Sequence, residues 1–216
     1  MRGSMMSFCF RTATLAIASM VFTAGAQQPN KFRVSDDTAG GSASWFNLAT
    51  FDGGNLEVSQ GTDPVTNNPA AFVEFEVSKP NFFVDLECYA PGSTLSSKAF
   101  SSVSFQLADI STCDGGTILF ADAEDCTTGT CVDIPLPHWS VSATWTKRGV
   151  RTRQQSGTTK FVEQDPFSGK ILFSSQMSGI VTFYDASFVV DVNEDINSGL
   201  GGINFSKGVT KIFTAN

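Results

Sequence analysis

Apolar and polar side chains alternate along this chain with a period of two residues, and this feature constrains its fold most. The alternation runs through residues 73–77, 102–107, 140–145 and 185–192, where every second side chain is Val, Phe, Leu, Ala or Trp. Successive side chains of a strand point to opposite faces, so each segment predicts a strand with one buried and one hydrated face. No segment has the pattern of an amphipathic helix with caps.

Short clusters of turn-forming residues separate these segments. They occur at residues 52–55, 63–64, 67–69, 91–92, 114–116, 166–169 and 201–202. About eleven to thirteen strands fit between them. Many short strands of this kind are typical of a sandwich or a barrel. We therefore expect an all-β fold, a single antiparallel β-sandwich of jelly-roll or Ig-like type, with a barrel as the alternative.

Residues 1–26 have the features of a secretory signal peptide. Arg2 and Arg11 provide positive charge, residues 15–22 form a short apolar core, and Ala24-Gly25-Ala26 is a small-x-small cleavage site. The apolar core is too short for a membrane span, which needs about 20 residues. The segment therefore predicts export.

The chain after this site, residues 27–216, shows no linker or change in composition, so we expect a single domain. Without Arg2 and Arg11 it has 12 basic and 21 acidic residues, a net charge of −9. This charge opposes the binding of nucleic acid, and no later segment predicts a membrane span. We expect a secreted protein, located outside the cell, at its surface or in a periplasm; the oligomeric state stays open.

Four cysteines remain in this domain: Cys88, Cys113, Cys126 and Cys131. An even number in an exported chain predicts disulfides, and four cysteines allow three connectivities. Cys126 and Cys131 are near enough in sequence to close a tight loop, and the other two each follow a segment with strand character, so we favour the pairs 88–113 and 126–131. A zinc site is the competing interpretation, but there is no Cys-x-x-Cys and only one histidine, His138.

No motif in the sequence is typical of a catalytic site. A serine triad would need His138, yet no Gly-x-Ser-x-Gly motif accompanies a strand. A histidine between a proline and a tryptophan at the entrance of a strand is more often structural. Paired carboxylates could serve a glycosidase or lyase, although acidic side chains in alternating strands usually face water. The candidates are Glu74, Glu76, Asp85 and Glu87.

Residues 191–199 are the best candidate for a metal site. Oxygen-bearing side chains recur at every second position, in Asp191, Asn193, Asp195 and Asn197, as in the first half of a calcium loop. The EF-hand pattern fails at its glycine and at its last ligand. We expect either a calcium ion held by a loop between strands, or a polar turn whose side chains bond to their own backbone.

A basic patch interrupts the acidic composition, and it consists of Lys147, Arg148, Arg151 and Arg153. Such a patch can bind an anionic glycan, a phosphate or an acidic partner. The alternative is a charged edge strand that discourages pairing with other sheets. We expect the contact surfaces for a ligand to be this basic hairpin, residues 147–153, the loop around His138 and Trp139, and the loop 191–199.

Three tryptophans could provide an aromatic platform for sugar rings. Trp145 shares the parity of the buried set in residues 140–145, which predicts a core position. Trp139 shares this parity but stands at the start of the strand, where it is partly open, and Trp45 is ambiguous.

Three short motifs resemble a group of secreted bacterial β-rich proteins of unassigned function. The motifs are Ser42-Ala43-Ser44-Trp45, Thr144-Trp145-Thr146 and Arg151-Thr152-Arg153. The resemblance covers most of the mature chain. The chain departs from these proteins at Lys147-Arg148, where a small-residue stretch is usual, and in its cysteines. The resemblance implies an exported β domain and no catalytic residues.

Three functions fit these features. The first is an exported, non-catalytic β-sandwich that binds an anionic glycan or another extracellular partner. The second is a glycan-active hydrolase or lyase, which predicts a cleft with two facing carboxylates, one with a raised pKa. The third is a structural surface or matrix component, which predicts flat, apolar, exposed patches and self-association.

Overall fold

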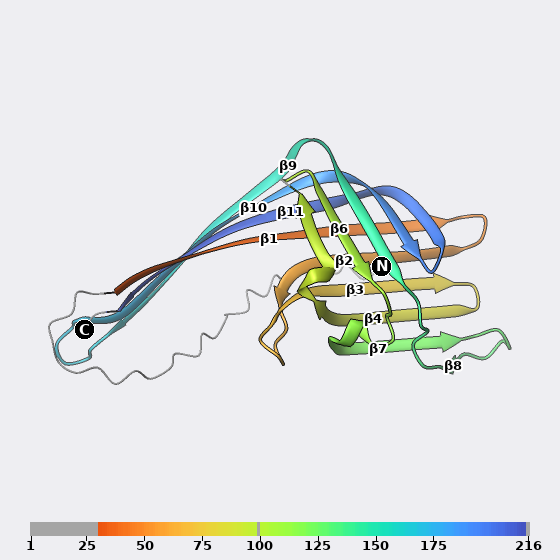
Figure 1. Cartoon of the computed structure of the whole chain (residues 1–216), viewed down its shortest axis with the longest axis horizontal. Coiled ribbons are helices and arrows are strands. Elements are labelled where there is room, and N and C mark those ends of the chain that lie inside the picture. The colour runs from red at the N-terminus through yellow and green to blue at the C-terminus, as the bar shows by residue number, and fades with distance from the viewer. Residues whose placement is uncertain (1–29, 99, 215–216) are drawn as a thin grey trace.

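The computed structural model describes residues 30–98 and 100–214, and it confirms the all-β prediction (Figure 1). The elements are β1 (Asn30–Asn47), β2 (Asp52–Thr62), β3 (Pro69–Lys79), β4 (Phe82–Pro91), η1 (Gly92–Thr94), β5 (Leu95–Lys98), β6 (Ser102–Leu107), η2 (Cys113–Gly115), β7 (Thr117–Asp125), β8 (Val132–Asp133), β9 (Val141–Gln164), β10 (Ile171–Val192) and β11 (Asp195–Thr214). The predicted signal peptide, residues 1–26, lies outside the described residues. Within the described ranges, no helix is both long and apolar enough to cross a membrane.

One antiparallel sheet contains all eleven strands, in the order β5-β6-β9-β10-β11-β1-β2-β3-β4-β7-β8. The pairing of β1 with β11 joins two meanders, so the first and last strands lie side by side. The two halves of the sheet face each other across one hydrophobic core, as a sandwich requires, although both layers belong to the same sheet (Figure 1). The sheet is not closed, because its end strands β5 and β8 do not pair. The barrel alternative is therefore wrong.

The four alternating segments form the core, with the faces that the sequence predicts. The buried side chains are Val73, Phe75, Val77, Val103, Phe105, Leu107, Val141, Ala143, Trp145, Ala186, Phe188, Val190 and Val192. The indole Nε1 of Trp145 donates to the carbonyl oxygen of Ser42 in β1, at 2.9 Å. A Cβ at Gly41 would lie 2.6 Å from the Trp145 ring, so the close packing there requires glycine.

Both predicted disulfides are present. Cys88 in β4 pairs with Cys113 in η2, and Cys126 pairs with Cys131 in the loop between β7 and β8. The first pair is fully buried and fixes η2 against the sheet. Since a disulfide-bonded cysteine offers no thiolate to a metal, a zinc site at these cysteines is excluded.

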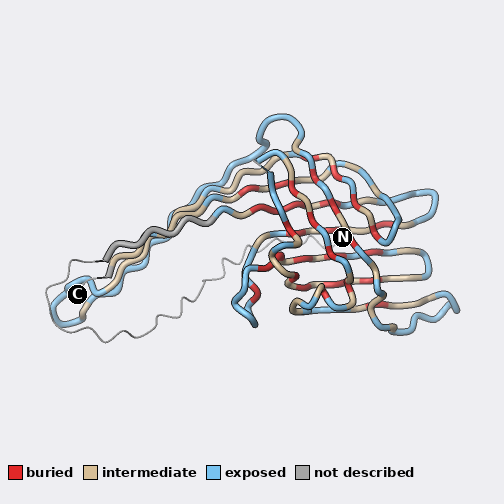
Figure 2. Tube along the Cα trace, in the orientation of Figure 1, coloured by how far each residue is buried: buried red, intermediate tan, exposed pale blue. Residues whose placement is uncertain are grey.

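The four long strands extend beyond the core as an arm (Figure 1). We define the arm as residues 30–38, 147–185 and 203–214, and the rest of the described chain as the body. The strand order in the arm is β9-β10-β11-β1. The partners of its outer strands end at the body, since β6 pairs with β9 only up to Thr146 and β2 pairs with β1 only from Gly40. Figure 2 shows that the buried residues gather in the body, while the arm is exposed or half-buried beyond Ile203 and Phe205, which belong to the core.

A bulge in β9 marks the point where the arm leaves the body. Register shifts flank Tyr184, so that Arg148, Gly149 and Val150 stand opposite the single residue Asp185. Extra residues of this kind bend a strand, and Gly149 has a positive φ of 68°, which glycine adopts without strain. The basic segment 147–153 is thus part of a continuous strand. Its prediction as a separate hairpin is wrong, because the chain first turns back between β9 and β10.

Candidate functional site

The predicted basic patch lies at the start of the arm, on β9: Lys147, Arg148, Arg151 and Arg153. Lys147 Nζ lies 4.2 Å from the ring centroid of Tyr184, and the Arg153 guanidinium lies 4.4 Å from that of Phe183. These cation–π contacts hold two of the charges against the sheet. The patch lies on an outer strand of the arm, so a ligand surface and a charged edge both fit this position.

His138 and Trp139, which form another predicted contact surface, lie apart from this patch. They precede Val141, where β9 begins in the body, whereas the basic residues follow Thr146. The ring of Trp139 packs against Phe82, with centroids 5.2 Å apart. Trp139 therefore belongs to the end of the body that faces away from the arm.

Charge is divided unequally between the arm and the body. The arm residues include ten Lys or Arg and five Asp or Glu, a net charge of +5. The body residues include two Lys, Lys79 and Lys98, and sixteen Asp or Glu, a net charge of −14. The chain is therefore strongly dipolar, with a basic arm that projects from an acidic body.

The outer side of β2, β3, β4, β7 and β8 forms a second charged surface, which we call the acidic face. Strand register places eight carboxylates on it: Glu57, Glu74, Glu76, Asp85, Glu87, Asp122, Glu124 and Asp133. Two rows each cross three neighbouring strands, Glu57–Glu74–Glu87 and Glu76–Asp85–Asp122. Carboxylate oxygens of Asp122, Glu124 and Asp133 lie within 4.8 Å of one another. Lys79, the one basic residue in these strands, lies on the opposite face.

Burial, and after it mutual repulsion, perturbs the titration of two carboxylates on this face. Burial, and then the neighbouring carboxylates of Glu57, Glu87 and Asp85, raise the pKa of Glu74. Burial and the Asp122 carboxylate raise the pKa of Asp85. Facing carboxylates with a raised pKa are one expectation of the hydrolase hypothesis. That hypothesis also requires a cleft, and these carboxylates stand on the open outer side of a sheet.

A small cleft lies at the end of the body remote from the arm. Its lining includes Trp45, Trp139, Lys79, Asp195 and Asn197. The cleft brings together Trp139 and the segment 191–199, which the sequence singled out separately. Its volume is about 70 Å³, well below the roughly 300–1,000 Å³ of pockets that enclose small molecules.

The four predicted calcium ligands do not converge. Asp195 and Asn197 pair with Val192 and Val190, so they share the face of these two buried residues. Asp191 lies between the two valines in sequence and therefore points to the other face. Asp195 Oδ2 already lies 3.4 Å from Lys79 Nζ, which places a cation beside that carboxylate.

The same segment has the geometry of a tight polar turn. Asn193 and Glu194 both have positive φ, as in the two-residue hairpin turns that suit twisted strands. Asp191 Oδ1 accepts a hydrogen bond from the backbone N–H of Glu194 at 2.8 Å. These contacts are those of the alternative interpretation, in which side chains bond to their own backbone.

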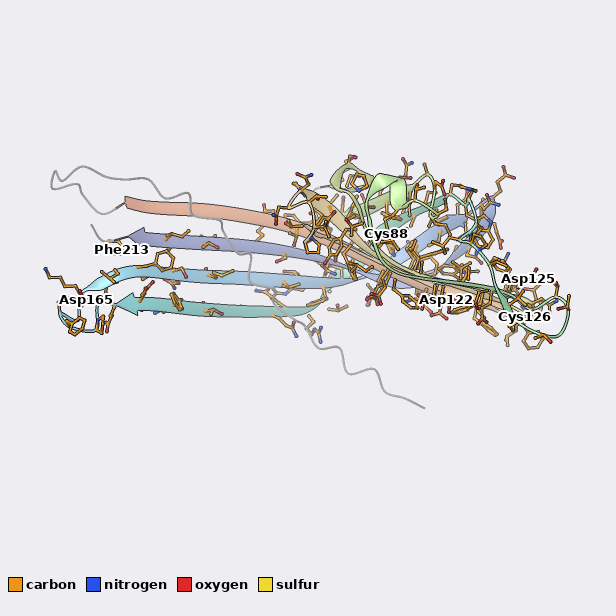
Figure 3. The ribbon with its side chains drawn as sticks, turned by 90° about the horizontal axis from the view of Figure 1, so that it is seen from below. Cys88, Asp122, Asp125, Cys126, Asp165 and Phe213 are labelled. Carbon is orange, nitrogen blue, oxygen red and sulfur yellow. A yellow bond between two sulfur atoms is a disulfide. The ribbon has the colours of Figure 1, made fainter. Side chains whose placement is uncertain are left out.

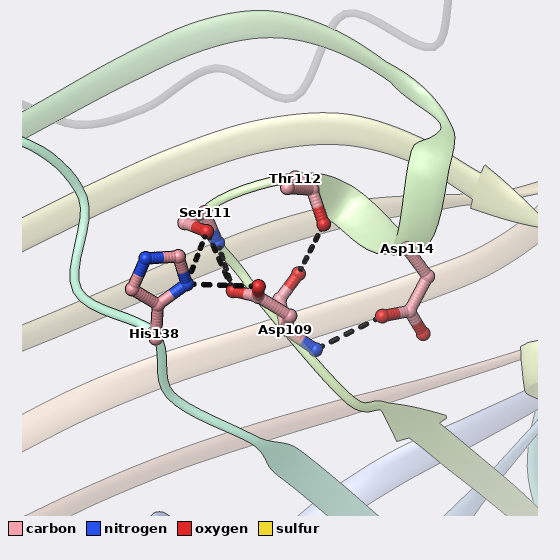
Figure 4. Close-up of polar contacts among 5 residues, drawn as sticks. All are labelled: Asp109, Ser111, Thr112, Asp114 and His138. Carbon is pink, nitrogen blue, oxygen red and sulfur yellow. Dashed lines mark hydrogen bonds and ion pairs between the residues drawn. The ribbon is translucent and has the colours of Figure 1, made fainter.

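His138 takes part in a polar cluster that joins two loops (Figure 4). Its Nδ1 lies 2.9 Å from Asp109 Oδ2 and 2.9 Å from Ser111 Oγ, and the Ser111 hydroxyl donates to Asp109 Oδ1 at 2.7 Å. Hydrogen bonds from Ser111 and His138 lower the pKa of Asp109. In a serine triad the histidine uses different nitrogens for the serine and the aspartate. Here both contact the same nitrogen, so the arrangement fits a structural role.

Sequence reasoning overlooked the basic residues of the arm beyond Arg153. Counting charges in successive segments would have revealed them, since residues 147–170 contain six Lys or Arg and two Asp or Glu, and residues 203–214 contain two Lys and no acidic residue. The predicted carboxylate candidates Glu74, Glu76, Asp85 and Glu87 all lie in the two acidic rows. The sequence does not predict the rows themselves, because they depend on which strands pair and in which register.

Comparison of the chain with protein-family models, with curated proteins and with solved structures gave no match. The resemblance to secreted bacterial β-rich proteins therefore stays a prediction.

Proposed function

We propose that the protein is an exported, non-catalytic binding protein whose arm is the contact surface for an acidic partner. The observation that carries this proposal is the net charge of +5 on an arm that projects from a body of charge −14. Clustered Lys and Arg side chains attract carboxylate, sulfate and phosphate groups and speed encounter with them.

The exposed apolar side chains of the arm support the same role. They include Phe161, Val162, Met177 and Ile180, each at least 44% exposed, and Phe167 in the tip loop, which is 99% exposed. An exposed apolar patch flanked by charges is typical of an interaction surface. The acidic partner can be an anionic glycan or the acidic surface of a protein, because the arm offers the same groups to both.

Retention on immobilised heparin, a sulfated polysaccharide, tests the proposal. The wild-type protein should bind at low salt and elute as salt screens the contact. The variant R151Q/R153Q should elute at lower salt, because it loses two charges of the arm. The variant K98Q, which removes a charge from the body instead, is the matched control and should elute with the wild type. A protein that flows through, or an arm variant that elutes unchanged, would contradict the proposal.

A further inference from the structure

We propose that the acidic face of one molecule receives the arm of a second copy. This inference rests on the proposed function, since it names the acidic partner of the arm. It also fits the third hypothesis from the sequence, a structural component that associates with itself.

The acidic face lacks positive charge of its own. Like charges directly opposite each other destabilise a pair of strands, and this face repeats that arrangement in two rows over three strands each. The five strands that build it carry no basic side chain on this side. A partner that brings ammonium or guanidinium groups to the rows would relieve the repulsion and gain favourable ion pairs.

One side of the arm presents matching charges. Lys160 on β9 and Lys211 on β11 are both register neighbours of Gln176 on β10, so the two lysines share a face with one strand between them. Lys207 lies on the same face of β11, four residues from Lys211, and its Nζ is 3.9 Å from the exposed Asp37 carboxylate. Two strand spacings separate Lys160 from Lys211 by about 10 Å, the same spacing that separates the first and third carboxylates of an acidic row.

The dimensions of the two surfaces agree. On the acidic face, β2, β3, β4 and β7 have 11, 11, 10 and 9 residues. At about 4.8 Å between strands and about 3.3 Å per residue they form an area of about 600 Å², which the four strands of the arm match in number. Joining the two would bury about 1,200 Å² in total, the lower end of the range for specific interfaces.

The partner must be another molecule, because the arm strands continue directly from the body and lead away from it (Figure 3). In that view Asp165 and Phe213 mark the far end of the arm, whereas Asp122 marks the acidic face on the body. An arm and a face are different surfaces, so one such contact repeated from molecule to molecule gives an open chain or a ring. A reciprocal exchange, in which each arm binds the face of the other molecule, gives a closed two-fold dimer.

Sedimentation velocity over a range of concentrations tests this inference. At about 0.01 M salt, where charges act over about 30 Å, we expect species larger than the monomer, and at about 1 M salt we expect mainly monomer. The arm variant K160E/K211E and the face variant E76K/E87K should each raise the dissociation constant about tenfold or more, because each places like charges across the contact. The single variants K160E and K98E form a matched pair, and only K160E should weaken association.

Mixing the two double variants provides the decisive comparison. The reversed arm and the reversed face attract each other, so an equimolar mixture should recover the large species that neither variant forms alone. Thermal unfolding of each variant establishes that it is folded. A dissociation constant that the face variant leaves unchanged, or a mixture that stays monomeric, would overturn the inference.

The heparin experiment separates this inference from the proposed function. If the protein binds heparin through the arm but stays monomeric at every salt concentration, the proposed function is supported and the inference is contradicted. If the protein neither binds heparin nor associates, both are contradicted.

Discussion

Three side-chain contacts stabilise the loops at the end of the body that is remote from the arm. Lys79 pairs with Asp195, Asp191 accepts the N–H of Glu194, and His138 joins Asp109. Each contact uses a group that the sequence marked as a candidate for chemistry. In the structure, Lys79, the backbone N–H of Glu194 and Asp109 are the partners of these groups, so the contacts position loops.

The calcium hypothesis leads to a simple prediction at this scale. Asp191 lies on the opposite face from Asp195 and Asn197, so the turn does not present a set of converging oxygens. We expect the melting temperature to be the same with a calcium chelator and with added calcium. A rise of several degrees on adding calcium would show that the loop rearranges to hold an ion.

The two disulfides should differ in their contribution to stability. A bridge restricts the unfolded chain more when it closes a longer loop, and the sequence separations are 25 for Cys88–Cys113 and 5 for Cys126–Cys131. The loop-entropy relation gives about 3.5 kcal/mol for the first and about 2 kcal/mol for the second. Denaturant unfolding of C88A/C113A and C126A/C131A should therefore show the larger loss in the first variant. The reverse order would count against this explanation.

Among the strands, the rows of like charge are the least expected feature. Glu57, Glu74 and Glu87 lie opposite one another in three neighbouring strands, and no basic residue separates them. Because the pKa of Glu74 is raised in the folded state, the folded protein binds more protons than the unfolded protein between the two pKa values. The free energy of unfolding contributed by Glu74 therefore falls as the pH rises through this window.

The variant E74Q measures this effect. It should be more stable than the wild type at about pH 7, by up to about 1 kcal/mol, and the difference should vanish below about pH 4, where Glu74 is protonated in both states. Thermal unfolding at both pH values provides the comparison. The control is E163Q, on the arm opposite Phe173 and away from the rows, for which we expect no such difference. Equal effects of the two variants would contradict a raised pKa of Glu74 in the folded state.

The elements of the body could be predicted from the sequence, but the arm could not. In residues 140–145 one face is buried and the other is exposed to solvent, so the alternation of apolar and polar side chains predicts the strand directly. In residues 150–164 of β9 both faces are exposed, and without a buried face the sequence carries no period of two. The cleft itself could not be predicted. The sequence singled out Trp139 and the segment 191–199 for other reasons, and only folding brings them together.

At the scale of the whole molecule, the separation of charge dominates the expected behaviour. The net charge of −9 over residues 30–214 favours solubility and repulsion between distant copies, whereas the basic arm and the acidic face attract each other at close range. Salt screens both effects, so association should depend strongly on ionic strength.

Carbodiimide cross-linking tests the central claim most directly, because it joins only lysines and carboxylates that are in contact. A mixture of isotopically labelled and unlabelled protein identifies the links between different molecules by mass spectrometry. We predict intermolecular links from Lys160 or Lys211 to Glu74, Glu76 or Glu87, and their loss at about 1 M salt. Links confined to pairs within one molecule, such as Lys79 with Asp195, would contradict the claim.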